Sequence, residues 1–189
     1  MWLDKGAYKL RVTSAAPELT AKRTIFSRKD VAWASVKSWR VETKRADLAA
    51  FKQAKTSLDQ AVLGEAAGDI VALLRKMFGT LPGWMVSTVA VGHSRRPDSF
   101  AVRLAQAVAA EFGLPFERRF ADRFVTGSSH PKEFSRLPPL QLLPGVLERP
   151  LLIVDDVATS GWHMEEALLA LRARGTTAFG IVWISGTGK

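Results

Sequence analysis

The chain has 189 residues, 47% of them hydrophobic, and carries a formal net charge of +9. This length and apolar content suffice for one domain with a core of its own. The absence of cysteine excludes disulfides and cysteine-based zinc sites, and the three histidines are too scattered to form a metal-binding motif. No apolar stretch approaches the ~18 residues needed to cross a bilayer, and no signal-peptide pattern is present, so we expect a cytoplasmic protein without a membrane segment.

Most of the positive charge lies in the first third of the chain. Residues 1–60 contain 13 Lys and Arg against 6 Asp and Glu, a balance of +7. Six aromatic residues are interleaved with these charges: Trp2, Tyr8, Phe26, Trp33, Trp39 and Phe51. Such a composition can bind nucleic acid by stacking and charge neutralisation, or it can form a small lobe with a solvated basic face. We prefer the second interpretation.

Short extended segments precede a helical region. The extended segments predict a small N-terminal lobe and lie at 8–13, 23–26 and 36–43. From Ala46 to Met77, apolar residues recur at helical spacing, and Gly64 and Gly68 predict a break between two helices. We therefore divide the chain into a basic N-terminal lobe, residues 1–45, and a core, residues 46–189.

The second half of the chain alternates predicted strands and helices. Strands are expected at 85–91, 115–124, 151–157 and 178–184, and helices at 99–112 and 162–174. Gly113 and Gly175 end the two helices, and a long proline-bearing connection covers 125–145. This alternation predicts an α/β fold with a parallel twisted sheet flanked by helices, and with ligands at the carboxyl ends of the strands.

The most informative segment is LLIVDDVATSG, residues 151–161. An apolar strand delivers Asp155 and Asp156, and a small turn then leads into a helix. The first-turn amides and the helix dipole suit an anion, Thr159 and Ser160 supply hydroxyl donors, and Gly161 permits close approach. A phosphate fits this turn, and the carboxylates fit the hydroxyls of an attached sugar. The alternative is an ordinary buried strand whose acidic end caps the next helix.

Residues 154–161 resemble the motif of the type I phosphoribosyltransferases, in which a hydrophobic strand, two acidic residues, an apolar and a variable residue precede a Thr/Ser-Gly turn. The resemblance implies that family's fold, with an N-terminal hood, and binding of phosphoribosyl pyrophosphate (PRPP) with Mg²⁺. It assigns Asp155 and Asp156 as catalytic and Mg²⁺-binding carboxylates, acting directly or through ribose hydroxyls or water. The implied 5-phosphate site comprises Val157, Ala158, Thr159, Ser160, Gly161 and His163.

Two further loops complete the site that the resemblance implies. The pyrophosphate loop would follow a strand and consist of Gly92, His93, Ser94, Arg95 and Arg96, although a basic surface turn is the alternative. A flexible loop with His130, Lys132 and Arg136 would close over the site, although such residues are more often plain surface charges. Residues 92–115 are most similar to the ComF branch, the competence-associated, amidophosphoribosyltransferase-like relatives.

Three features depart from these families. The ComF relatives usually carry an N-terminal cysteine zinc knuckle, which this chain cannot build. Trp162 and His163 stand where the family generally has a small residue followed by Thr or Ser. Thr159 occupies the position where hypoxanthine-type relatives place an Asp as a base for the purine, so salvage of an oxopurine is disfavoured.

The preferred hypothesis is a phosphoribosyltransferase of nucleotide metabolism. It would transfer ribose 5-phosphate to or from an unidentified nitrogenous acceptor, with PRPP or a nucleoside 5′-monophosphate as ligand. The second hypothesis is a non-catalytic regulatory or nucleic-acid-binding protein of the competence or DNA-uptake type on the same scaffold. A third, phosphate-ester hydrolysis or transfer with Asp155 as nucleophile, leaves the Thr-Ser-Gly turn unexplained. The sequence leaves a homodimer open.

Overall fold

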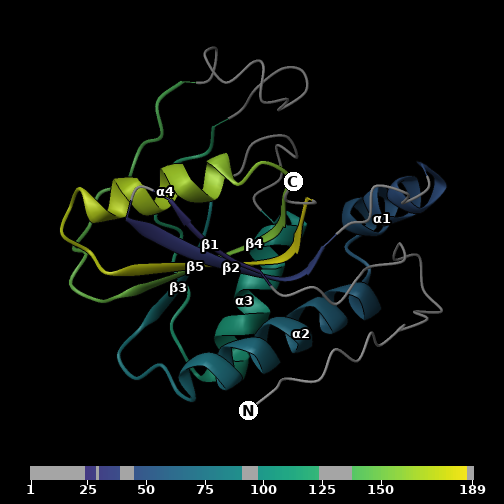
Figure 1. The fold of residues 1–189 in the computed structure, drawn as a ribbon, viewed down its shortest axis with the longest axis horizontal. Helices are drawn as coiled ribbons and strands as arrows, with labels where there is room; N and C mark the ends of the chain where they lie inside the picture. The colour runs from purple at the N-terminus through teal and green to yellow at the C-terminus, as the bar shows by residue number, and fades with distance from the viewer. Residues whose placement is uncertain (1–23, 29, 39–44, 91–97, 124–137, 187–189) are drawn as a thin grey trace.

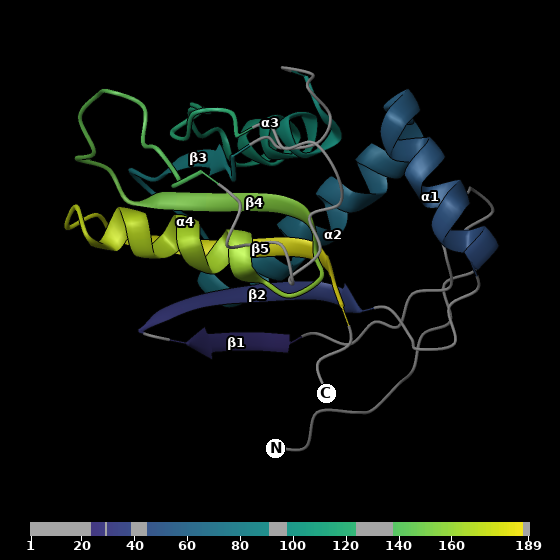
Figure 2. The same ribbon diagram turned by 90° about the horizontal axis from the view of Figure 1, so that it is seen from above.

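A five-stranded sheet organises the protein (Figures 1 and 2). The computed structural model describes residues 24–28, 30–38, 45–90, 98–123 and 138–186. The strands are β1 (Thr24–Arg28), β2 (Val31–Ser38), β3 (Met85–Thr88), β4 (Leu151–Ala158) and β5 (Ala178–Ser185), in the order β1-β2-β5-β4-β3. All neighbours are parallel except β1 and β2. The predicted α/β class with a mostly parallel sheet is confirmed.

Helices cover both faces of this sheet. The four helices are α1 (Arg45–Ser57), α2 (Gln60–Phe78), α3 (Phe100–Phe112) and α4 (Trp162–Arg172). Helices α2 and α3 pack on one face and α4 packs on the other, while α1 lies beside the edge where β2, β4 and β5 end (Figures 1 and 2). Among the described helices, none combines the length and the hydropathy needed to cross a bilayer.

The sequence of β4 begins with a continuous apolar run because both faces of this strand are covered. Side chains alternate between faces, so Leu152 and Val154 join the cluster under α2 and α3, whereas Leu151 and Ile153 join the cluster under α4. Each of these side chains is fully buried, which contributes roughly 1.5–3 kcal/mol apiece to folding. A strand covered on both faces cannot show polar alternation. Its polar residues are therefore confined to its carboxyl end.

The strands nearest the N-terminus belong to the same sheet as the predicted core. Strand β2 pairs with β5 in parallel, with Trp33 opposite Gly180. The division of the chain at residue 45 stays a prediction, and residues 1–23, 29 and 39–44 lie outside the described residues. Trp33 and Phe51, two of the aromatic residues considered for nucleic-acid stacking, are buried in the cores and unavailable for that role.

The predicted helix break at Gly64 and Gly68 is wrong. Both glycines lie inside α2, and the chain turns at Leu58, which has a φ of 55°. Asp59 caps α2, because its Oδ1 accepts hydrogen bonds from the amides of Ala61 at 3.0 Å and Val62 at 3.1 Å. Burial of the apolar face of α2 outweighs the low helix propensity of the two glycines.

The predicted strand at 115–124 is also wrong. Its described residues make only isolated bridges, Val86 with Phe116 and Phe120 with Leu142. Polar anchoring replaces a ladder here, since the buried Arg119 side chain donates to the Val146 carbonyl at 3.1 Å. By contrast, α3 ends as predicted at Gly113, which adopts a left-handed conformation. Most of the predicted connection at 125–145 lies outside the described residues.

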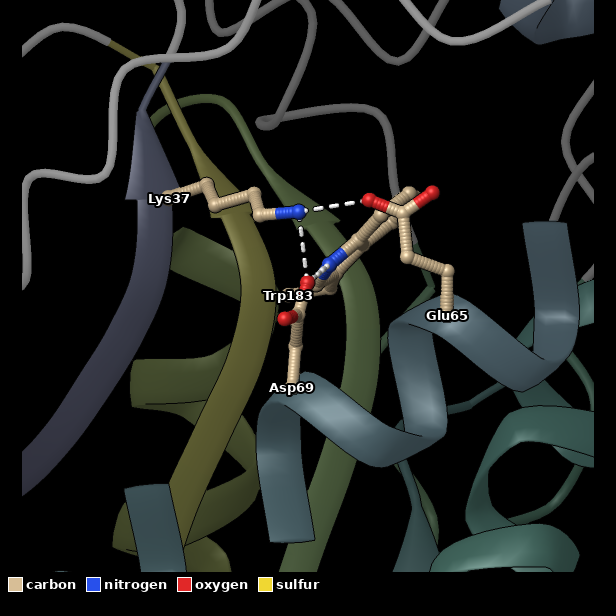
Figure 3. Close-up of polar contacts among 4 residues, drawn as sticks. All are labelled: Lys37, Glu65, Asp69 and Trp183. Carbon is tan, nitrogen blue, oxygen red and sulfur yellow. Dashed lines mark hydrogen bonds and ion pairs between the residues drawn. The ribbon is translucent and has the colours of Figure 1, made fainter. Parts of the chain in front are cut away.

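A partly buried charge network ties β2 to α2 close to the carboxyl edge of the sheet (Figure 3). Lys37 Nζ lies 2.7 Å from Glu65 Oε1 and 2.6 Å from Asp69 Oδ2. Trp183 of β5 donates from Nε1 to the same Asp69 oxygen at 2.8 Å. Burial lowers the pKa of Lys37, but the hydrogen bonds to Asp69 and Glu65 outweigh it and leave that pKa raised. The network fixes β2 and β5 against α2.

Replacing Gly64 and Gly68 with alanine should stabilise the protein. Both positions are exposed within α2, and a Cβ at either would meet no atom within 4 Å. Because alanine loses less backbone entropy in a helix, each change should raise the free energy of unfolding by about 0.5–1 kcal/mol. Urea unfolding measures this. A decrease in both variants would show that α2 is not continuous through these positions.

Candidate functional site

The candidate site lies where β4 meets α4. Asp155, Asp156, Val157 and Ala158 end the strand, residues 159–161 form a turn, and His163 lies in the first turn of α4. A pocket of about 80 Å³ opens at this junction and is lined by Asp155 and residues 157–164. The structure thus brings the acidic pair and the implied phosphate-binding residues together at the carboxyl edge of the sheet.

Two contacts hold the turn in its shape. Gly161 has a φ of 77°, and a Cβ there would lie 2.5 Å from the ring of Trp33, so only glycine fits. On the other side, the Gly186 amide donates to the Ala158 carbonyl at 2.7 Å, and a Cβ on Gly186 would lie 2.6 Å from the Thr159 carbonyl oxygen. Strand β2 and the end of β5 therefore support the turn from both sides.

The turn presents free hydrogen-bond donors to the pocket. Within the described part of the chain, the amides of Thr159, Ser160 and Gly161 donate no hydrogen bond to a protein group. Helix α4 begins without a side-chain cap at Gly161. Thr159 is exposed, whereas Ser160 is half-buried and Gly161 is buried. Buried amides almost always have a partner, and at a helix N-terminus an anion is well suited to supply it. The turn therefore has the donors that binding of a small anion requires.

Asp155 contributes a carboxyl group with a strongly altered acidity. Burial, reinforced by the charge of Asp156, raises its pKa to about 8, against the smaller opposing effects of Lys55 and of a hydrogen bond from the Asp156 amide. That amide donates to Asp155 Oδ1 at 2.8 Å. Asp155 also lines the pocket. At neutral pH and without a ligand, it therefore favours its protonated form, and a bound cation or hydroxyl would change that balance.

Asp156 faces a different neighbour. Its Oδ2 lies 2.6 Å from Nζ of Lys55, which projects from α1, and it does not line the pocket. Burial lowers the pKa of Lys55, but the charges of Asp156 and Asp155, with the hydrogen bond to Asp156, leave that pKa raised. The side chains of adjacent strand residues point to opposite faces, which explains how the two carboxylates take separate surroundings.

The donor set fits Mg²⁺ only in part. Buried carboxylate oxygens are the ligands that this ion prefers, and it commonly uses one or two of them with water and ligand phosphates. Among the described residues there is no group of three or more His, Cys, Asp or Glu side chains that could hold a metal ion. The two carboxylates would therefore need oxygens from water or a bound ligand to complete the coordination.

The remaining predicted site residues lie outside the described residues. These are the pyrophosphate loop, Gly92, His93, Ser94, Arg95 and Arg96, and the flexible loop with His130, Lys132 and Arg136. Sequence reasoning missed Lys55 and the structural role of Trp33. Neither residue has a local signal that points to the turn, because each reaches it through the tertiary fold.

No family model matches the chain, and neither does any curated protein. Solved structures resemble it. The structure of the allosteric regulatory enzyme of purine biosynthesis is 23% identical over 63% of this chain and 25% of that one, with a TM-score of 0.40.

Two further solved structures resemble the chain at low identity. A hypothetical protein from Neisseria gonorrhoeae with bound ppGpp is 14% identical over 67% of this chain and 68% of that one, with a TM-score of 0.45. Orotate phosphoribosyltransferase from Aeropyrum pernix is 17% identical over 85% of this chain and 73% of that one, with a TM-score of 0.42. Because these likenesses are weak, the function of the site has to be inferred from the geometry of the site itself.

The raised pKa of Asp155 predicts a pH-dependent cost to stability. The carboxyl stays protonated in the folded chain up to about pH 8, whereas in the unfolded chain it ionises near pH 4, so the folded state binds more protons in between. Stability should therefore fall as pH rises through this window. Asp155→Asn should remove that contribution, so the variant's advantage in urea unfolding should grow from pH 4 to pH 8. Parallel pH profiles for both proteins would contradict the assignment.

Proposed function

We propose that the chain binds a 5-phosphorylated ribose, in the form of PRPP with Mg²⁺ or a nucleoside 5′-monophosphate, and acts as a phosphoribosyltransferase. The observation that carries this proposal is the turn at 159–161, whose three unpartnered amides lie beside a pocket that Asp155 also lines. An anion site and a carboxyl group a short distance apart match a phosphate and the hydroxyls of its sugar. The resemblance of residues 154–161 to the phosphoribosyltransferase motif supports the same ligand.

The turn would hold the phosphate by chemistry that needs no positive side chain. Amides of Thr159, Ser160 and Gly161 donate to phosphate oxygens, and the hydroxyls of Thr159 and Ser160 add donors. The dipole of α4 stabilises the negative charge. Trp33 and Gly186 keep the amides in place, so little reorganisation is required on binding. His163, which also lines the pocket, can donate to the phosphate.

The carboxylates would bind the ribose. Asp155 lines the pocket next to the turn and can accept a hydrogen bond from a ribose hydroxyl. During displacement of pyrophosphate, the anomeric carbon develops positive charge, which ionised carboxylates nearby would stabilise. Mg²⁺, when bound through one of these carboxylates and through ligand oxygens, would neutralise pyrophosphate and organise the ribose hydroxyls.

The other parts of the proposed site come from the sequence. The loop with Gly92, His93, Ser94, Arg95 and Arg96 would hold pyrophosphate, and the loop with His130, Lys132 and Arg136 would exclude water. Thr159 offers no base for an oxopurine, so a different nitrogenous acceptor is proposed. Membership of the ComF branch, a hood formed by the N-terminal residues, a cytoplasmic location and a homodimer stay predictions.

A second candidate function is ligand sensing without turnover. The observation that favours it is the ion pair of Lys55 with Asp156, which leaves one of the two carboxylates already neutralised. Such a protein would bind PRPP or a nucleotide at the same turn and regulate a partner, nucleic acid included. Release of pyrophosphate from PRPP in the presence of ammonia, amines and nucleobases distinguishes an enzyme from a sensor, because a sensor would bind PRPP and release none.

Placing a negative charge in the turn should abolish phosphate binding. Ser160→Asp puts a carboxylate among the three amides, where it repels the phosphate and competes for its donors. Calorimetric affinity for PRPP with Mg²⁺ should fall about 100-fold or more, as expected for like charges a few ångströms apart in a half-buried site. Ser160 is half-buried and outside the cores, so the fold should persist.

The matched control is Ser160→Asn, which has nearly the same size as the aspartate but no charge. It should keep PRPP affinity within a few-fold of the unmodified protein. Equal affinities for the Asp and Asn variants, with both folded by circular dichroism, would show that phosphate does not bind at this turn.

A further inference from the structure

We propose that Lys55 is the resident cation of the acidic pair, and that a divalent cation reaches Asp156 only by displacing the Lys55 ammonium group. This inference rests on the proposed function, because it concerns how the same carboxylates receive a metal ion. It makes Lys55 a positioning residue that sets the cation affinity of the site. Nothing in the residues around the motif at 154–161 indicates such a role, since Lys55 lies about a hundred positions earlier in the chain.

The ion pair is short, and it is largely shielded from water. Lys55 Nζ lies 2.6 Å from Asp156 Oδ2, and the Asp156 side chain is 8% exposed. At this burial, a single carboxylate is costly to leave without a countercharge. The ammonium group supplies that countercharge in the absence of any ligand. It lies against Oδ2, one of the two carboxylate oxygens of Asp156, so a metal ion that approaches this group meets a positive charge already in place.

Helix α1 delivers the ammonium group from a packed position. Phe51 and Ala54 are buried in the core under α2 and α3, and the Phe51 ring lies 5.7 Å from that of Trp183. The backbone that carries Lys55 is thereby anchored. The Lys55 side chain itself is 31% exposed, so its flexible end has room to swing toward solvent while α1 stays in place.

A second buried polar group lies on the same face as Asp156. Thr88 pairs with Val154 in register, and Val154 and Asp156 are two positions apart, so all three side chains point to one face of the sheet. The Thr88 hydroxyl is buried and has no hydrogen-bond partner. Buried hydroxyls are normally paired, so this one is a further polar group without a partner on the face that carries Asp156.

Metal binding to variants tests the displacement directly. The probe is Mn²⁺ alone, which like Mg²⁺ prefers oxygen ligands and can be counted by electron paramagnetic resonance. Lys55→Met keeps the aliphatic stem and removes the competing charge, and should bind Mn²⁺ about ten-fold or more tightly than the unmodified protein. Lys52→Met removes the same charge from an exposed position on α1, and should change the affinity less than two-fold.

A second measurement on the unmodified protein keeps the inference testable if Lys55→Met does not fold. Mass spectrometry of amine acetylation should show slow labelling of Lys55 that accelerates several-fold on adding Mn²⁺, while Lys52 labels at a constant rate. Unchanged Mn²⁺ affinity in a folded Lys55→Met, equal tightening by Lys52→Met, or Lys55 labelling that ignores Mn²⁺ would each overturn the inference. Because no PRPP is present, these failures are separate from a failure of phosphate binding at the turn.

Discussion

The structure depends on how it accommodates two adjacent carboxyl groups at the buried end of β4, an interior strand of the sheet. Desolvating a carboxylate costs several kcal/mol unless a countercharge, a proton or a ligand compensates. Here the burial of the two carboxyl groups is compensated in different ways. Asp156 takes the ammonium group of Lys55, and burial raises the pKa of Asp155 so that it holds a proton at neutral pH. A site that costs stability in this way is typical of function rather than of packing.

Distant parts of the chain converge on the end of β4. Helix α1 supplies Lys55, and its Phe51 anchors that helix next to Trp183. Strand β2 supplies Trp33, whose ring leaves room only for glycine at position 161. Trp33 thus supports the turn, and Lys55 neutralises Asp156. Trp33 and Phe51 are buried, which weakens the nucleic-acid interpretation of this part of the chain.

The local parts of the fold and site could be predicted from sequence. The apolar run before Asp155, the small turn and the helix after Gly161 are contiguous, and Gly113 ends α3 because glycine accepts a left-handed conformation. The helix break lies at Leu58 rather than at the two glycines, because Asp59 caps α2 and the glycines are tolerated inside it. Lys55 and Trp33 could not be predicted, since no periodicity links residues over a hundred positions apart. That the side chains of Asp155 and Asp156 point to opposite faces of the sheet is predictable from the sequence, because successive side chains in a strand alternate.

The central claim is that the turn at 159–161 binds the phosphate of a phosphorylated ribose. Titrating PRPP with Mg²⁺ into ¹⁵N-labelled protein, and following the amide resonances by nuclear magnetic resonance, tests it most directly. The account predicts that the amides of Thr159, Ser160 and Gly161 shift together and saturably, downfield as hydrogen bonds to phosphate form, and that ribose without phosphate leaves them unchanged. Saturable binding of PRPP that leaves these three amides unperturbed would contradict it.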